Sequence, residues 1–356
     1  MEQFTRQLII WYHQNYRELP WRSTKDPYKI WISEVILQQT RVNQGLDYYN
    51  RFIERWPTVT DLAIASEQEV LKMWQGLGYY SRARNLLCTA VILKNQYNGL
   101  FPDSALRLRK LKGIGPYTAA AIASNAFDEK VAVVDGNVMR FVARLQGILF
   151  ATDTNACKNA VQMAVDAFID EEKPGIFNQA MMEFGALHCT PARPQCNHCP
   201  FSSQCFAFQH AMVDQLPVKK QKIIVRTRYF NYLYISVKNN NMDAIYLGER
   251  TKKDIWKGLY EFPLIETQSE YDFDSICQTV EFKNLLLEEH FELSSVSKII
   301  KHQLTHQTIF AKFFVIKLKK RLPLLQISLP LVNKSDLPKY PLSRLIDRFL
   351  REIDIL

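Results

Sequence analysis

The sequence lacks any long hydrophobic run. None of its apolar stretches reaches the roughly 18 to 20 residues that a helix needs to cross a bilayer, so we expect no membrane span. The first residues, MEQFTRQLIIWYHQNYRELPWR, mix charge and aromatic side chains too evenly for a secretory signal peptide. We therefore expect an intracellular, cytoplasmic protein.

Internal repeats and low-complexity segments are absent as well. The 356 residues are too many for one ordinary core and predict two domains. A composition of 47% hydrophobic and 23% charged residues is typical of a soluble globular protein. The net charge of +9 favours an anionic partner, with nucleic acid as the leading candidate and a membrane surface or a merely basic soluble protein as alternatives.

The apolar pattern changes partway along the chain. Up to about residue 210, apolar residues recur at helical spacing, as in 65–87 and 137–149, which predicts a bundle of short helices. Residues 216–228 hold five basic residues, no acid and a proline, which is typical of an exposed linker. From residue 229 onward we expect a small α+β domain. Its predicted strands are 228–238, 243–250 and 309–319, and its predicted helices are 282–291 and 342–353.

Cysteine is scarce, with seven in all, yet four lie within 17 positions. These four follow the spacing C-x6-C-x2-C-x5-C and are Cys189, Cys196, Cys199 and Cys205. Disulfides are rare inside cells, so we interpret the four as metal ligands. Zinc usually takes two C-x2–4-C pairs, whereas one C-x2-C flanked by wider gaps suits a 4Fe-4S cluster better. Small buried hydrophobes are a poor alternative, because three prolines make this segment a loop.

This cysteine loop, placed after a helical bundle, resembles the cluster loop of the endonuclease III superfamily of DNA glycosylases. Residues 111–122, LKGIGPYTAAAI, resemble its helix-hairpin-helix, in which Gly113 and Gly115 permit a tight turn and the next helix presents free amides to a DNA phosphate. In VAVVDGNVMRF, Asp135 stands at the position of the catalytic aspartate. Capping of the following helix is the alternative role for Asp135.

Two further positions indicate the type of glycosylase. Tyr117 stands where strand-cleaving members carry a lysine that forms a Schiff base, so we expect base removal without a lyase step. Glu34 lies among Trp, Ile, Val and Leu in WISEVILQQTRV, which predicts a buried carboxyl that holds its proton as a general acid does. An exposed helix glutamate is the alternative.

Together with LPWR, GLGYYSRARNL and FNQAMMEFGA, these strings resemble the MutY family of adenine DNA glycosylases over almost all of residues 4–210. That family carries a C-terminal domain folded like Nudix hydrolases, and DIWKGLYEFP, residues 254–263, resembles its glycine and aromatic segment. No Arg-Glu-x-x-Glu-Glu occurs after residue 226, so this domain should recognise and not hydrolyse. The predicted protein is multidomain: a mostly α helix-hairpin-helix glycosylase domain with an iron–sulfur cluster loop (1–215), a basic linker (216–228) and an α+β Nudix-like domain (229–356).

The resemblance implies excision of adenine mispaired with 8-oxoguanine or guanine in duplex DNA, in base excision repair, by a monomer associated with the nucleoid. The nucleotide must first be rotated out of the helix. Glu34 would protonate N7 of adenine, and ionised Asp135 would stabilise the oxocarbenium ion, electrostatically or as a transient adduct. An apolar setting for Glu34 and a polar Gly-Asn turn for Asp135 should give them opposite protonation states. Tyr117 and Asn137 would orient the pair.

The resemblance also assigns binding residues. Arg22 would contact the adenine edge, and Gln179 and Glu183 would line the pocket unless they are ordinary polar residues of a helix face. The residues implied to wedge into the base stack are Gln39 and Tyr79, with Thr40 and Leu77 beside them. In KHQLTHQTIF, Leu304, Thr305 and His306 stand where the family carries Phe-Ser-His, so Thr305 and His306 would meet the lesion base without the aromatic. The cluster itself would shape the loop that carries Arg193, whose track Lys219, Lys220 and Lys222 would extend.

Two other functions share parts of this pattern. A glycosylase for oxidised pyrimidines with lyase activity would want lysine in place of Tyr117 and would have no reason for the second domain. A non-catalytic iron–sulfur protein that binds DNA would not need both Glu34 and Asp135.

Overall fold

The computed structural model describes residues 2–219, 225–239, 242–286, 289–322, 329–353 and 355. The chain divides into two compact units, Met1–Ala65 with Asn85–Gln221, and Ser66–Arg84 with Lys222–Leu356. The predicted linker falls in part on residues 220–224, which lie outside the described residues together with Lys220 and Lys222. The first strand begins at Arg226, so the last three residues of the predicted linker belong to a sheet.

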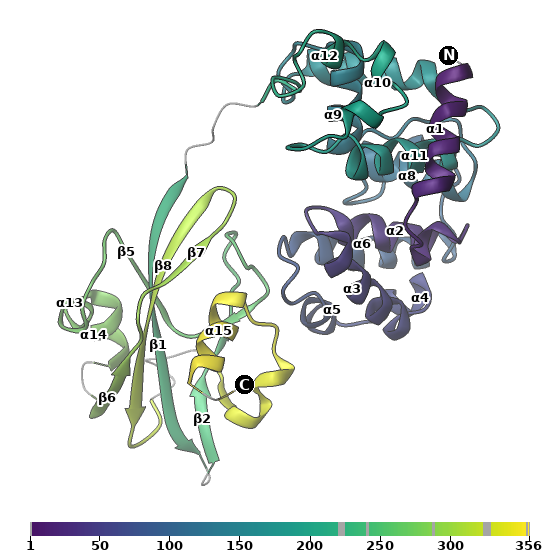
Figure 1. Cartoon of the computed structure of the whole chain (residues 1–356). Coiled ribbons are helices and arrows are strands. Elements are labelled where there is room, and N and C mark those ends of the chain that lie inside the picture. The colour runs from purple at the N-terminus through teal and green to yellow at the C-terminus, as the bar shows by residue number, and fades with distance from the viewer. Residues whose placement is uncertain are drawn as a thin grey trace. The chain divides into compact units, whose positions relative to one another are not determined.

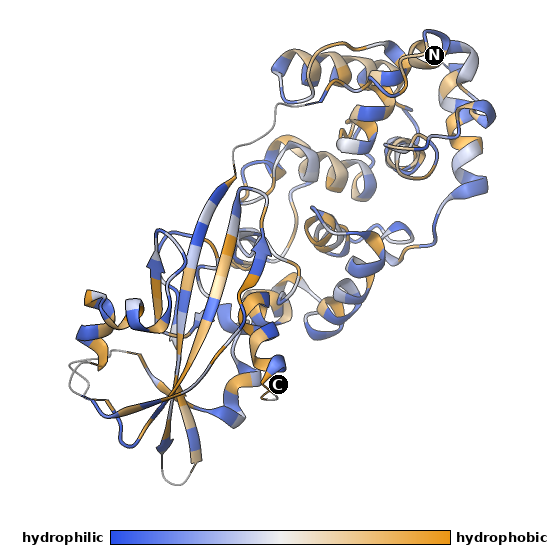
Figure 2. Cartoon of the chain, turned by 60° about the vertical axis from the view of Figure 1, so that its left-hand side comes forward, coloured by the Kyte–Doolittle hydropathy of each residue, from blue (hydrophilic) through white to orange (hydrophobic). Residues whose placement is uncertain are grey.

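The first unit is helical, as predicted (Figure 1). Its elements are α1 (Glu2–Asn15), η1 (Pro20–Arg22), α2 (Pro27–Leu37), α3 (Val42–Arg55), α4 (Val59–Ala63), α7 (Ala105–Leu108), α8 (Pro116–Ala126), α9 (Gly136–Gln146), α10 (Asn155–Phe168), α11 (Pro174–Leu187), η2 (Cys196–His198), η3 (Ser202–Gln204) and α12 (Phe206–Gln209). Helix α5 (Glu67–Met73) lies in the second unit, and α6 (Ser81–Tyr97) runs from the second unit into the first. Figure 2 shows hydrophobic and hydrophilic residues mixed along these helices. Among the described residues, no helix has the length and apolar character that crossing a bilayer requires.

Helix-start signals in the sequence position the elements that carry the site. Asp26 caps α2 by accepting from the amide of Tyr28, and a proline follows at the first helical position. Helix α8 also begins with a proline, Pro116, after a short turn from α7. Gly113 in that turn has a φ of +78°, and a Cβ there would lie 2.6 Å from Cβ of Asn85. Gly115 has an ordinary φ of −83° and open space around it, so only Gly113 needs glycine for its conformation.

The second unit is built on a seven-stranded mixed sheet within the described residues, in the order β6-β8-β1-β2-β9, with β5 on β1 and β7 on β8. Only β1 and β8 pair in parallel, whereas the other pairs are antiparallel. The strands are β1 (Arg226–Asn239), β2 (Met242–Tyr246), β5 (Leu264–Thr267), β6 (Phe291–Val296), β7 (Ile300–Gln303), β8 (Gln307–Leu318) and β9 (Leu331–Asn333), and β3 (Gly248–Glu249) and β4 (Tyr260–Glu261) form a second, small sheet.

Helices cover both faces of the large sheet (Figure 1). On one face, α15 (Arg344–Glu352) packs Phe349 against Phe313 of β8 with ring centroids 4.0 Å apart. On the other face, α13 (Phe273–Cys277) and α14 (Val280–Leu286) pack against alternate residues of β1 and β8. Successive side chains of β1 and β8 point to opposite faces of the sheet, so the residues that face one core recur with a period of two. The α+β prediction is confirmed, although the helix expected at 282–291 ends at Leu286 and β6 begins at Phe291.

Candidate active site

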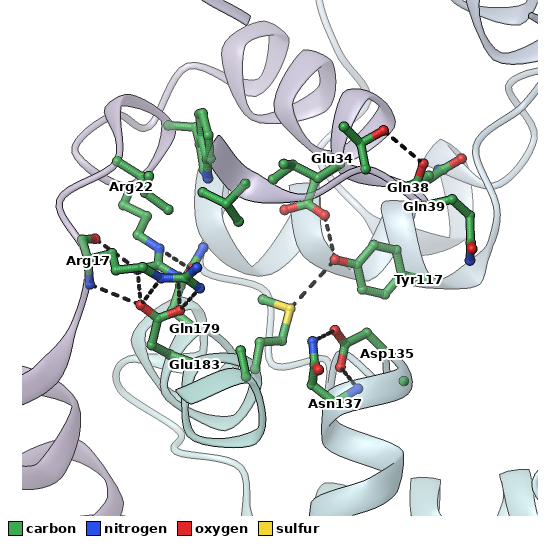
Figure 3. A pocket seen from close by; sticks show the side chains of 18 of the residues that line it. Arg17, Arg22, Glu34, Gln38, Gln39, Tyr117, Asp135, Asn137, Gln179 and Glu183 are labelled. Carbon is green, nitrogen blue, oxygen red and sulfur yellow. Dashed lines mark hydrogen bonds and ion pairs between the residues drawn. The ribbon is translucent and has the colours of Figure 1, made fainter. Parts of the chain in front are cut away.

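One pocket of the first unit holds a buried, protonatable carboxyl. Glu34 lies on α2 with only 5% of its surface exposed, as its apolar neighbours predict. Its Oε2 accepts a hydrogen bond of 2.6 Å from the hydroxyl of Tyr117 on α8 (Figure 3). Burial raises the pKa of Glu34 to about 7, and the negative charge of nearby Asp135 adds to this, while the Tyr117 bond and Arg22 act against it. A carboxyl with this pKa can donate a proton near neutral pH.

Asp135 enters the same pocket from the N-terminus of α9. Its Oδ1 accepts from the amides of Asn137 and Val138 at 2.8 and 2.7 Å, and its Oδ2 accepts from the side-chain amide of Asn137 at 2.8 Å (Figure 3). It therefore caps the helix, which is the alternative role considered above, while its side chain also lines the pocket. Burial raises the pKa of Asp135 too, although its three hydrogen bonds pull the pKa down.

The opposite end of the pocket is ion-paired. Glu183 on α11 is 1% exposed and accepts from Arg17 and Arg22, with Nη2–Oε2 distances of 2.5 and 2.7 Å. Burial alone would raise the pKa of Glu183, but the bonds from the two guanidinium groups bring it down to about 2. Arg22 also donates through Nε to Gln179 at 3.0 Å and through Nη1 to the carbonyl of Arg17 at 2.9 Å. Four of its five N–H groups are thus engaged.

The pocket has a volume of about 600 Å³, a size typical of small-ligand sites. It brings together predicted residues from five separate segments of the chain, namely Arg22, Glu34, Gln39, Thr40, Tyr117, Asp135, Asn137, Gln179 and Glu183. Of the residues that the structure describes, no lysine lines this pocket, and Tyr117 takes the place expected for one. The sequence interpretation missed Arg17 and Met182, which also line the pocket. Arg17 had one available signal, its place in RELPWR five residues before Arg22.

Four other predicted residues lie in the second unit, around a different cavity of about 470 Å³. These residues are Leu77, Tyr79, Thr305 and His306. The hydroxyl groups of Tyr79 and Thr305 are 2.6 Å apart and share a hydrogen bond. Tyr79, the predicted wedge, is 51% exposed, whereas Leu77, which was predicted to lie beside it, is buried. Thr305 and His306 form the exposed turn between β7 and β8.

The predicted wedge residues share a backbone feature that the sequence interpretation did not foresee. Gln39 and Tyr79 have φ angles of +60° and +46°, in the left-handed region that non-glycine residues rarely adopt. Both side chains are exposed. Strained conformations of this kind cluster at functional sites, where surrounding structure holds them.

The four clustered cysteines line one small cavity. Among the described residues, no group of three or more His, Cys, Asp or Glu side chains is placed so that it could hold a metal ion. Burial raises the pKa of the Cys189 and Cys199 thiols, the latter to about 12. Buried Arg144 faces Cys189 with an Nη1–Sγ distance of 3.5 Å and donates to the carbonyl of Thr190 at 2.7 Å.

The cysteine loop is tied to the pocket by a residue that the sequence interpretation missed. Arg140 on α9 donates through Nε to the carbonyl of Cys189 at 2.8 Å and through Nη2 to the side-chain oxygen of Asn137 at 3.1 Å. Asn137 in turn bonds Asp135. The i, i+3 spacing of Asn137 and Arg140 on one helix was the available signal.

Comparison with known proteins assigns the two domains. Residues 32–162 match the HhH-GPD superfamily of base excision DNA repair proteins, and residues 233–352 match the NUDIX domain. The chain is 35% identical over 310 residues to an adenine DNA glycosylase of Buchnera aphidicola subsp. Baizongia pistaciae, covering 86% of this chain and 84% of that protein. The chain belongs to the adenine DNA glycosylase family.

A second relative and a solved structure agree with this family assignment. It is 35% identical over 362 residues to an adenine DNA glycosylase of Arabidopsis thaliana, covering 87% of this chain and 57% of that protein. Among solved structures, a thermostable thymine-DNA glycosylase is similar with a TM-score of 0.54 and 28% identity, covering 59% of this chain and 96% of that one. The predicted helix-hairpin-helix glycosylase domain and Nudix-like domain are thereby confirmed.

Proposed function

We propose that this chain hydrolyses the N-glycosidic bond of adenine mispaired with 8-oxoguanine or guanine in duplex DNA. The proposal is carried by one observation: a buried Glu34 with a pKa of about 7 shares a pocket with Asp135, which is held at a helix N-terminus. The domains implied for this activity are those predicted above, 1–215 and 229–356. We further propose that the chain acts as a monomer in the cytoplasm, on nucleoid DNA.

The first chemical step would be proton donation. Adenine leaves poorly as an anion, so a proton delivered to N7 allows it to depart as a neutral base. Burial raises the pKa of Glu34 to about 7, so the carboxyl can hold this proton near neutral pH. The hydroxyl of Tyr117 fixes the carboxyl through Oε2, which leaves Oε1 to face the base. Burial also raises the pKa of Tyr117, so its hydroxyl keeps its proton as a donor.

The second step would be stabilisation of the sugar cation. Departure of the base leaves positive charge on the sugar, and an ionised carboxylate nearby lowers the energy of that state. Asp135 is suited to this role because three N–H donors and the N-terminus of α9 favour its anionic form. Asn137 orients Asp135 through its side-chain amide. Water then attacks the sugar.

Recognition of adenine would use the ion-paired end of the pocket. Arg22 keeps one N–H of Nη2 without a partner among the described residues, and we assign this donor to the adenine edge. Gln179 and Glu183 hold Arg22 in place. Gln39 and Tyr79 would fill the space left by the rotated nucleotide, with Thr40 nearby. A phosphate would bind at Gly113 and Gly115, where α8 begins with free amides, and the net charge of +9 favours such a partner.

The cysteine loop fits a 4Fe-4S cluster. Cys189, Cys196, Cys199 and Cys205 line one cavity, and their C-x6-C-x2-C-x5-C spacing suits a polynuclear iron–sulfur group better than one zinc ion. Such a cluster would supply structure to the loop and no step of the reaction. The chain's own contribution is the link from Cys189 through Arg140 to Asn137.

Recognition of the opposite base is assigned to the second unit. Thr305 offers a hydroxyl and His306 an imidazole from an exposed turn, next to Tyr79. Leu304, in place of the family's phenylalanine, packs partly buried against the domain core, so the aromatic contact of the turn is lost.

Single-turnover excision tests the proposal. Duplexes carry adenine opposite 8-oxoguanine, guanine or thymine, and base release is followed over time. We expect the fastest release opposite 8-oxoguanine, slower release opposite guanine and the slowest opposite thymine. Release of no adenine from any duplex would refute the proposed activity, and equal rates on all three would remove the recognition role from Thr305 and His306.

A further inference from the structure

The cavity beside Thr305 has a second wall that no assignment above explains. Residues 254–256, between β3 and β4, line the same cavity of about 470 Å³ as the turn 304–307. The inference drawn from this wall rests on the proposed function, because that function makes the cavity a site for the base opposite adenine.

The aromatic residue of this wall has an unusual backbone. Trp256 has a φ of +60°, which is a strained outlier for a bulky residue. Its ring is half-buried and contacts His302 of β7 edge-on, with centroids 5.5 Å apart. Such backbone strain persists only where neighbouring structure holds the residue in place.

Arg228 on β1 holds the wall and the turn together. This guanidinium is 6% exposed and uses all five of its N–H groups. It bonds both oxygens of Glu266 on β5 at 2.7 and 2.6 Å and both oxygens of Asp254 at 3.0 and 2.8 Å. Its remaining N–H reaches the side-chain oxygen of Gln307, at the end of the turn, at 3.0 Å. The planar guanidinium group of Arg228 therefore fixes both the loop 254–256 and the turn 304–307 relative to the sheet.

A second arginine fastens the same loop from the other side. Arg250 donates to the carbonyl of Ile255 at 2.8 Å and to Oδ2 of Asp254 at 2.6 Å. Burial alone would raise the pKa of Asp254, but its bonds to Arg228 bring it down to about 2, so the ion pairs persist at neutral pH. The residues directly before Trp256 thus have little freedom, which explains how the strained conformation is kept.

We propose that the loop 254–256 is a second element of the site that reads the base opposite adenine, with Trp256 as its contact surface and Arg228 as its positioning residue. The chemistry of the two walls suits an oxidised purine within duplex DNA. Trp256 offers an aromatic surface to a base or sugar, while Thr305 and His306 offer polar groups to the base edge. Neither wall alone supplies both.

The test uses the full chain with Arg228→Lys and Trp256→Gly, and it compares excision of adenine opposite 8-oxoguanine with excision opposite guanine. Lysine keeps the charge but cannot bond two carboxylates and Gln307 at once. Glycine accepts a φ of +60° without strain, so Trp256→Gly removes the ring with little backbone penalty. We expect each variant to lower the preference for 8-oxoguanine over guanine roughly tenfold.

Lys312→Gln is the matched control. It breaks an ion pair of the same domain, between Lys312 of β8 and Glu270 at 2.8 Å, and neither residue lines the cavity. We expect this control to keep the wild-type preference. A wild-type preference that both Arg228→Lys and Trp256→Gly retain would overturn the role of the loop. Equal wild-type rates on the two duplexes would instead overturn the proposed recognition of 8-oxoguanine, so the two failures are distinguishable.

Discussion

The two ends of the candidate active-site pocket each bury a glutamate, yet the two glutamates have opposite pKa shifts. Glu34 is 5% exposed and Glu183 is 1% exposed, so burial does not distinguish them. The pKa of Glu34 is raised to about 7, whereas that of Glu183 is lowered to about 2. The difference lies in their partners, a single tyrosine hydroxyl for Glu34 and two guanidinium groups for Glu183.

The opposite pKa shifts suit the two glutamates to different chemical roles. A buried carboxyl without a counter-charge holds a proton that it can give away, and a buried carboxyl with two counter-charges is a fixed anion that orients other groups. Exchanging the partners would exchange the roles.

Glu34→Gln removes the proton donor while keeping the shape of the side chain. We expect adenine excision to fall by about three orders of magnitude, because general acid catalysis contributes on that scale. Binding to the mispaired duplex should be retained, and gel-shift titration alongside single-turnover kinetics measures both. Glu54→Gln, at an exposed position of α3, is the control and should excise adenine at the wild-type rate. A Glu34→Gln variant within tenfold of wild type would disprove the acid assignment.

Asp135→Asn separates catalysis from helix capping. Asparagine caps a helix about as well as aspartate, so the free energy of unfolding should change by less than about 0.5 kcal/mol. Excision should nevertheless fall about 100-fold, because the charge opposite the sugar cation is gone. Thr154→Ala, which removes the cap of α10, should show the reverse, a loss of about 1 kcal/mol in stability at an unchanged rate. Wild-type excision by Asp135→Asn would leave capping as the only role of Asp135.

Much of the fold could be predicted from sequence because it follows local periodicity. The helices of the first half and the strands around 228–238 and 309–319 have apolar residues at periods of 3.6 and 2. The boundaries were less predictable. β1 begins within the segment expected to be a linker, because Arg226 and Arg228 are polar residues that pair with β8 and with carboxylates.

Those parts of the site that depend on one short segment could be predicted from the sequence. Those parts that depend on contacts between distant segments could not. The burial of Glu34 follows from its neighbours in sequence. Nothing local to Arg17 indicates that it bonds Glu183, 166 residues away, or that Asp135 is buried enough for its pKa to rise. The left-handed backbone of Trp256 was equally hidden, because Arg228, which holds the loop before it, comes from β1.

Glu183→Gln tests the ion-paired end. Two guanidinium groups lose their buried counter-charge, so we expect the free energy of unfolding at pH 7 to fall by about 3 kcal/mol, measured by urea denaturation. The sign of the pH dependence follows from the lowered pKa. The stabilisation by Glu183 is present above its ordinary pKa of 4.5 and is lost as the pH falls towards about 2, so the gap between variant and wild type should narrow over that range. A gap that stays constant from pH 7 to pH 3 would show that the ion pairs are not its source.

Tyr117→Phe should have the smallest effect of the four changes, because it shifts the pKa of Glu34 without removing the carboxyl group. In wild type, excision should decline as the pH rises through about 7, where Glu34 loses its proton. The bond from the Tyr117 hydroxyl favours the carboxylate, so its loss should raise the pKa of Glu34 further and move this decline to higher pH by about one unit. Tyr28→Phe removes another buried hydroxyl, which donates to the carbonyl of Trp56 at 2.8 Å, and should leave the pH profile in place. A decline that moves to lower pH in Tyr117→Phe would mean that the hydroxyl stabilises the protonated acid and contributes to the raised pKa of Glu34.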